Sequence, residues 1–208
     1  MDIGDVSSRK WPQRPEEPGA AHCFPQGGSA LACDWRRHVR QVPDFPRPGV
    51  LFYDLMPVLA HPDARDALVC DLVKAVGPWQ PQVVAAPEAR AFLLAAAVAD
   101  RLSCGLLALR KPGKLPPPRV AQSYALEYGQ ETLEAPAWIA LRGQRVVAID
   151  DVLATGGTAQ AVFSLIGRLG GHVVGGAFAI EIAALRGRAQ LPDVAVKALW
   201  SVGGPEGL

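Results

Sequence analysis

Two adjacent acids, Asp150 and Asp151, directly follow a charge-free apolar run at residues 146–149. The run predicts a strand buried on both faces, which delivers both carboxylates to one edge of a sheet. Neighbouring carboxylates repel each other, so a site that holds both favours a polar or cationic ligand. A ribose diol can donate a hydrogen bond to each acid, and a hydrated magnesium ion can be held beside them. The pair therefore predicts a sugar site, a metal site or both.

The segment after the acids, residues 154–158, is Ala-Thr-Gly-Gly-Thr and precedes a helical pattern. The glycines let the backbone close around an anion, Thr155 and Thr158 add hydroxyl groups, and N–H groups at a helix start favour a phosphate. The chain has neither the Gly-Lys-Ser/Thr of a Walker loop nor a Gly-x-Gly-x-x-Gly after a strand. The combination predicts a phosphate site of another kind, and the alternative is a solvated acidic turn at a strand end.

The rest of the chain supplies the elements that position this segment. Its patterns predict helices over residues 62–76, 89–102 and 158–169, and strands over residues 83–86, 106–109, 145–149, 173–180 and 194–202. They also predict a short helix over residues 31–40, a short extended segment over 51–55 and a long proline-rich loop over 110–119. The alternation predicts an α/β fold with a mostly parallel central sheet flanked by helices. Ligands of such sheets bind at the carboxyl ends of the strands, where the loops after residues 86, 109 and 149 lie.

Composition and charge limit the kind of protein. The chain has 208 residues, is 50% hydrophobic and carries a net charge of +1, which gives no support for a nucleic-acid or membrane-surface partner. No charge-free run, residues 91–99 and 172–180 among them, reaches the roughly 20 residues of a membrane span. Residues 1–30 hold four prolines and predict a disordered tail ahead of one domain over 31–208. The scattered cysteines (Cys23, Cys33, Cys70 and Cys104) predict reduced thiols in a cytoplasmic protein.

Residues 146–158 resemble the phosphoribosyl-pyrophosphate (PRPP) signature of type I phosphoribosyltransferases. Four further segments narrow the resemblance to the adenine phosphoribosyltransferase family: residues 42–52 (Val-Pro-Asp-Phe-Pro-Arg-Pro-Gly-Val-Leu-Phe), 87–92 (Pro-Glu-Ala-Arg-Ala-Phe), 110–115 (Arg-Lys-Pro-Gly-Lys-Leu) and 123–129 (Ser-Tyr-Ala-Leu-Glu-Tyr-Gly). Residues 181–191 are similar to the family's C-terminal stretch, in a form closer to animal than to bacterial members. The resemblance covers about residues 30–202.

The resemblance implies the type I phosphoribosyltransferase fold, with a small N-terminal hood over residues 31–60 and a mobile lid loop. It implies transfer of the 5-phosphoribosyl group from PRPP to adenine, which gives AMP and pyrophosphate in purine salvage. Magnesium is expected to arrive with PRPP, without a direct ligand from the protein. The expected partners are the two substrates and a second copy of the chain, because sites of this family borrow loop residues across a two-fold interface.

The resemblance also assigns the PRPP contacts. Ala154, Thr155, Gly156, Gly157 and Thr158 match the residues that bind the 5′-phosphate, and Asp150 and Asp151 match those that bind the ribose diol. Glu88, Ala89 and Arg90 match the pyrophosphate-binding loop, whose small middle residue tolerates a cis peptide bond. Arg110 and Lys111 are expected at the pyrophosphate as well, and the family's lid allows Arg110 to reach the neighbouring subunit.

Catalytic roles are implied for Arg90, Lys114 and Glu127. A cation at a helix start is unfavourable unless an anion is present, which favours pyrophosphate contact by Arg90. Glu127 is expected to handle a proton of adenine or to stabilise positive charge. The base is expected between backbone groups near Leu51 and the side chains of Tyr53 and Tyr128, with Phe52 in the core.

Three departures from the family pattern keep alternatives open. Tyr53 stands where the family usually has a basic residue, Ala91 where it usually has glycine, and three prolines at 116–118 stiffen the lid. One alternative is a catalytically weak or inactive AMP- or PRPP-binding paralogue that acts as a sensor or partner subunit. Another is a transferase for a different base, such as hypoxanthine or guanine.

Overall fold

The computed structural model describes residues 33–126 and 129–203. The disordered tail predicted for residues 1–30 lies outside these ranges, and so do the first two residues of the helix predicted over 31–40.

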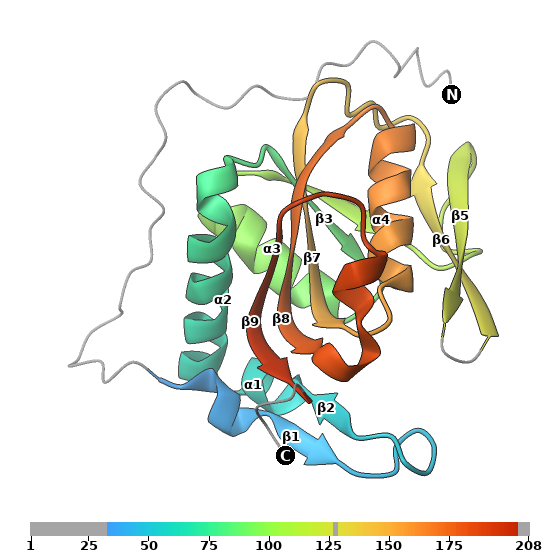
Figure 1. Cartoon of the computed structure of the whole chain (residues 1–208). Helices are drawn as coiled ribbons and strands as arrows, with labels where there is room; N and C mark the ends of the chain where they lie inside the picture. The colour runs from blue at the N-terminus through green and yellow to red at the C-terminus, as the bar shows by residue number, and fades with distance from the viewer. Residues whose placement is uncertain (1–32, 127–128, 204–208) are drawn as a thin grey trace.

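A five-stranded parallel sheet forms the centre of the molecule (Figure 1). Its strands, in spatial order, are β4 (Gly105–Leu109), β3 (Val83–Pro87), β7 (Arg145–Leu153), β8 (His172–Ile182) and β9 (Val196–Val202). Every residue of β3 is buried, because helices cover both faces of the sheet and leave no solvent-facing side. This architecture confirms the predicted α/β fold of the type I phosphoribosyltransferases.

Alternate residues of the central strands point into two separate apolar layers. Val84 and Val147 pack with α2 (Pro62–Val76) and α3 (Ala91–Arg101), and their neighbours Val83 and Val146 pack with α4 (Gly157–Arg168) on the opposite face. Figure 1 shows α2 and α3 on one side of the sheet and α4 on the other. The sheet therefore holds the start of α4 and the start of α3 at the carboxyl ends of its strands.

Two antiparallel pairs lie outside the central sheet. The pair of β1 (Arg40–Val42) and β2 (Phe52–Asp54), with α1 (Met56–Ala60), occupies the region predicted as the hood. The hairpin of β5 (Arg119–Leu126) and β6 (Gly129–Pro136) packs against α4. Neither this hairpin nor α1 was predicted from the sequence.

Several predicted boundaries were wrong, and three of them concern β7 and the hood. Strand β7 does not end at Ile149 but continues through both acids to Leu153, because the long strand β8 offers pairing partners as far as Glu181. The helix predicted over residues 31–40 is only the 3-10 helix η2 (Trp35–His38), which is capped by Asp34 and followed by β1. The extended segment predicted over 51–55 ends at residue 54, where α1 follows.

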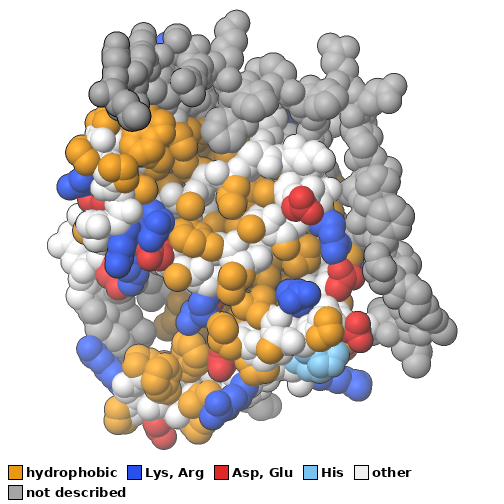
Figure 2. Space-filling model, turned by 180° about the vertical axis from the view of Figure 1, so that it is seen from behind, with side chains coloured by type: hydrophobic (Ala, Val, Ile, Leu, Met, Phe, Trp, Pro, Cys, Tyr) orange, Lys and Arg blue, Asp and Glu red, His pale blue; other side chains and the backbone are white. Residues whose placement is uncertain are grey.

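Acidic and basic side chains are interspersed with apolar ones on the face seen in Figure 2. This mixture agrees with the net charge of +1. Across the described ranges, no helix combines the length and the apolar character that a membrane crossing requires.

Candidate active site

The acid pair meets a cation at the carboxyl end of β7. Asp151 is buried, Asp150 is half-buried, and the Asp151 N–H donates to Asp150 Oδ1 at 2.8 Å. Arg90, the N-cap residue of α3, donates from Nε to Asp151 Oδ2. The pairing of β3 with β7 thus brings together two predicted site residues, Arg90 and Asp151, that are 61 residues apart in the chain.

The charged forms of Asp150 and Asp151 are unfavourable side by side without a further positive group. Burial and repulsion by Asp151 raise the pKa of Asp150, and the charge of Arg90 offsets only part of that effect. A cation or a hydroxyl donor beside Asp150 would favour its charged form. The pair is therefore suited to a sugar diol or to a hydrated magnesium ion, whose preferred ligands are oxygen atoms.

The predicted pyrophosphate loop joins β3 to α3. Its Glu88–Ala89 peptide bond is cis, the form that the sequence allowed. The Glu88 carboxylate accepts the Lys111 N–H at 2.7 Å and Arg110 Nε at 3.2 Å, and these bonds lower the pKa of Glu88. Arg110 therefore pairs within its own chain in this structure. The neighbouring Ala89 and Arg90 are exposed and available to a ligand.

The remaining lid candidates lie in the loop between β4 and β5. Lys111 Nζ contacts Glu131 of β6 at 3.1 Å, so this part of the loop is fixed to the hairpin. Lys114 is exposed, and its charge contributes to the lowered pKa of Glu88. Glu127 and Tyr128 lie outside the described residues.

The predicted phosphate-binding segment, residues 154–158, runs into α4, which begins at Gly157. Gly156 has φ +89°, a left-handed conformation that L side chains rarely adopt. Gly157 lies against the hairpin, and a Cβ there would be 2.3 Å from the Ala125 carbonyl oxygen. The two glycines thus have separate structural requirements, one for backbone conformation and one for close packing.

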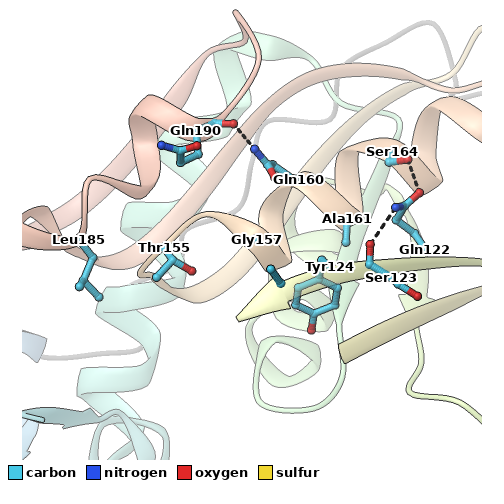
Figure 3. A pocket seen from close by; sticks show the side chains of 11 residues that line it. Gln122, Ser123, Tyr124, Thr155, Gly157, Gln160, Ala161, Ser164, Leu185 and Gln190 are labelled. Atoms are coloured by element: carbon cyan, nitrogen blue, oxygen red, sulfur yellow. Dashed lines mark hydrogen bonds between the residues drawn. The ribbon is translucent and has the colours of Figure 1, made fainter. Parts of the chain in front are cut away.

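A pocket of about 650 Å³ lies between the turn, α4 and the β5–β6 hairpin (Figure 3). Two of the predicted phosphate-binding residues, Thr155 and Gly157, line it, and the acid pair does not. Its walls are mostly polar, and they consist of Gln122, Ser123, Tyr124, Ala125, Thr155, Gly157, Gln160, Ala161, Ser164, Leu185 and Gln190. Burial raises the pKa of Tyr124 to about 12, so its hydroxyl stays protonated and donates to Glu131 at 3.1 Å.

The hood approaches the site through Phe52. Its ring lies 5.4 Å from the Arg90 guanidinium and 5.1 Å from the ring of Phe45, so the expectation that Phe52 belongs to the core was wrong. Successive strand residues face opposite ways, and Tyr53 packs its ring edge-on against Trp200 at 6.0 Å. Leu51, which directly precedes β2, is exposed.

The described residues contain no group of three or more His, Cys, Asp or Glu side chains that could hold a metal ion. Cys33 is a free thiol, Arg101 donates to the sulfur of Cys70, and Cys104 Sγ donates to the Pro81 carbonyl oxygen. Cys23 lies outside the described residues. Ala91, which stands where the family usually has glycine, is buried in the first turn of α3.

Fold and site together define a phosphoribosyltransferase, with an acid pair on a central strand followed by an Ala-Thr-Gly-Gly-Thr turn at a helix start. Residues 62–201 match the phosphoribosyl transferase domain. The adenine phosphoribosyltransferase of Gluconacetobacter diazotrophicus is 49% identical over 168 residues, which are 81% of this chain and 95% of that protein. The enzyme of the same name from Corynebacterium efficiens is 51% identical over 160 residues, which are 76% of this chain and 83% of that protein. The chain belongs to the adenine phosphoribosyltransferase family.

Solved structures agree with this assignment. The adenine phosphoribosyltransferase of Thermoanaerobacter pseudethanolicus has a TM-score of 0.77 and 42% identity, over 79% of this chain and 96% of that chain. The enzyme of Saccharomyces cerevisiae, solved with adenine and an imino-altritol bisphosphate, has a TM-score of 0.74 and 30% identity over the same shares. The greater closeness of residues 181–191 to animal members stays a prediction.

Proposed function

We propose that this chain transfers the 5-phosphoribosyl group from PRPP to adenine, forming AMP and pyrophosphate in purine salvage. The observation that carries the proposal is the contact of Arg90 with Asp151, which brings the predicted pyrophosphate loop to the predicted ribose-binding acids. The breaking bond of PRPP joins the ribose to the pyrophosphate, so a site for this reaction must hold both groups side by side.

In the proposed complex, the turn at residues 154–158 binds the 5′-phosphate with backbone N–H groups and the hydroxyls of Thr155 and Thr158. The ribose diol donates to Asp150 and Asp151. Arg90 then turns from Asp151 toward the pyrophosphate, a strong acceptor of charge-assisted hydrogen bonds. This exchange of partners keeps the guanidinium paired both before and after the substrate binds.

During the proposed reaction, a ring nitrogen of adenine forms a bond to C1 of the ribose while the bond from C1 to the pyrophosphate oxygen breaks. Positive charge develops on the ribose, and the carboxylates beside it stabilise that charge. Arg90, Lys114, Lys111 and Arg110 are proposed to neutralise the leaving pyrophosphate, and Glu127 is proposed to handle the proton that adenine loses.

Magnesium fits the acid pair, because two carboxylates that lack a full complement of positive charge lie together there. When bound together with PRPP, the ion supplies neutralising charge at the pyrophosphate. We propose that Asp150 and Asp151 hold the ribose and, with it, the waters of the ion, without a protein ligand of their own to the metal.

Adenine is proposed to lie under the hood. Backbone groups near Leu51 read the edge of the base, and Tyr128 closes over it. The base-framing role expected of Tyr53 does not fit this placement, because its ring packs against Trp200 on the face of β2 opposite to Phe52. The half-buried ring of Phe52 beside Arg90 supplies an apolar surface for stacking. Neither the inactive paralogue nor the transferase for another base has support, because each relative named above is an adenine phosphoribosyltransferase.

We also propose a cytoplasmic homodimer. Leu93 of α3 and Leu106 of β4 are 56% and 39% exposed on neighbouring elements at the β4 edge of the sheet. Burial of this apolar edge against a second copy would remove it from water.

The double substitution Asp150→Asn with Asp151→Asn tests the proposed site. It removes both ribose-binding charges with little change of shape, and AMP formation is expected to be lost. The matched control is Asp66→Asn, which removes a carboxylate that pairs with Arg101 at the far end of α3 and should keep full activity. Full activity in the double variant would refute the site.

A further inference from the structure

We propose that Glu181, Gly187 and Arg188 form a brace that fixes the phosphate turn, residues 154–157, and thereby determines the affinity for the 5′-phosphate. The inference rests on the proposed function, since it takes this turn as the phosphate site. The three are positioning residues, because they act through the backbone of the turn and touch no substrate.

The outer part of the brace is a bidentate ion pair between Arg188 and Glu181. Glu181, near the end of β8, is only 8% exposed, and its carboxylate accepts Arg188 Nε at 3.1 Å and also Arg188 Nη2. Arg188 Nη1 donates to the Val196 carbonyl oxygen at 2.8 Å. These bonds fix the 3-10 helix η5 (Gly187–Gln190) to the two last strands of the sheet. A planar guanidinium matches this geometry, and a lysine cannot reproduce it.

The inner part of the brace is a contact between two backbones. A Cβ on Gly187 would lie 2.1 Å from the Ala154 carbonyl oxygen, and a Cβ on Gly156 would lie 2.5 Å from the Gly187 carbonyl oxygen. The Gln160 side-chain amide of α4 also donates to the Gln190 carbonyl oxygen, a bond visible in Figure 3. No side chain separates η5 from the turn, so a shift of η5 must shift the turn.

The brace contacts one subsite only. Its contacts described above lie in the turn, in α4 and in the last two strands. The pyrophosphate loop is held separately by the bonds of Glu88 to Arg110 and Lys111. A disturbed brace should therefore weaken ligands that carry a 5′-phosphate and spare inorganic pyrophosphate. A purely structural role would weaken both ligands alike.

The test compares Gly187→Ala with Gly167→Ala by calorimetric titration of ribose 5-phosphate and of inorganic pyrophosphate into the full chain. Gly187 has no positive φ, so alanine there adds only the steric clash with the backbone of Ala154 and Gly156. A Cβ at Gly167 inside α4 meets nothing within 4 Å. In Gly187→Ala, the Kd for ribose 5-phosphate should rise roughly 10-fold or more, with a change below about twofold for pyrophosphate. Gly167→Ala should bind both ligands like the wild type.

Glu181→Gln is the second variant, because it keeps the side-chain shape and removes the charge that holds Arg188. It should raise the KM for PRPP more than it lowers kcat. Unchanged affinity for ribose 5-phosphate in both variants, or an equal loss for both ligands, would overturn the brace. If the wild type bound ribose 5-phosphate but formed no AMP, the proposed function would fail while the comparison of the variants still decided the brace.

Discussion

At the residue scale, Arg90 connects three parts of the site. It donates to Asp151 of β7, lies over the ring of Phe52 in the hood, and occupies the N-cap position of α3. A cation at a helix N-terminus is unfavourable by itself, and the two acids supply the compensating charge. The resemblance and the helix-start argument together assigned this negative charge to the pyrophosphate, and in this structure Asp151 supplies it.

Asp150→Asn should stabilise the protein while it abolishes activity. Burial and Asp151 raise the pKa of Asp150 above its ordinary value of 3.8, so the folded chain keeps a proton that the unfolded chain has released. Through this group, the free energy of unfolding therefore falls as the pH rises from that ordinary value through the raised one. The Asp150→Asn variant has no carboxyl group to titrate here, so its free energy of unfolding does not fall with pH in this way. Each kcal/mol by which it exceeds the wild type raises the Tm by about 2–4 °C.

Thermal unfolding of the wild type and of Asp150→Asn between about pH 4 and pH 8 checks this prediction. The difference in Tm should grow toward the higher pH. Equal Tm values across the range would show that burial and Asp151 do not strain Asp150.

At the element scale, the β5–β6 hairpin is attached to the same helix that begins at the phosphate turn. Ser164 donates to Gln122 Oε1 at 2.9 Å, Arg168 donates to the Ala121 carbonyl oxygen, and Ala125 packs on Gly157. The hairpin, α4 and the turn are thus joined by direct contacts. Displacement of one of these elements should disturb the others.

Ser164→Ala should loosen the hairpin without disturbing the central sheet. The substitution removes the bond to Gln122, which is worth about 0.5–1.5 kcal/mol. Amide hydrogen exchange in β5 and β6 is expected to become faster, with exchange in α2 and β7 unchanged as the internal reference. Uniform acceleration across all elements would contradict a local attachment.

The sequence predicted elements well where one local pattern decides the structure. Helix α2 has the predicted bounds, because its apolar residues recur at helical spacing and Pro62 begins it. The end of β7 could not be predicted, since it depends on how far β8 pairs with it. The hairpin escaped prediction because a polar residue, Gln122, faces α4 and breaks the apolar alternation of a strand.

In the candidate site, too, features set by local sequence could be predicted and features set by distant contacts could not. The acid pair and the glycine turn are contiguous in sequence, so their chemistry was visible before the fold. The contacts of Phe52 with Arg90 and of Gly187 with Ala154 join distant segments, and only the packed structure reveals them. For the brace, the sequence showed only that residues 181–191 are similar to the family's C-terminal stretch.

At the scale of the whole molecule, the exposed leucines at the β4 edge lead to a prediction about assembly. The wild type should have twice the chain mass of 22.0 kDa in light scattering coupled to size exclusion. Leu93→Glu with Leu106→Glu should shift the mass toward that of one chain. The two added carboxylates would have no cationic partner, and their charge opposes burial of the edge. A monomeric wild type, or a dimer unaffected by both charges, would place the interface elsewhere or exclude it.

Steady-state product formation from PRPP, magnesium and a panel of bases tests the central claim most directly. With adenine, the purified chain should form AMP at roughly 1 s⁻¹ or faster, within the range of ordinary enzymes. Hypoxanthine and guanine should give far less product, despite Tyr53 in place of the usual basic residue. Folded protein that forms no AMP, or that prefers another base, would contradict the account.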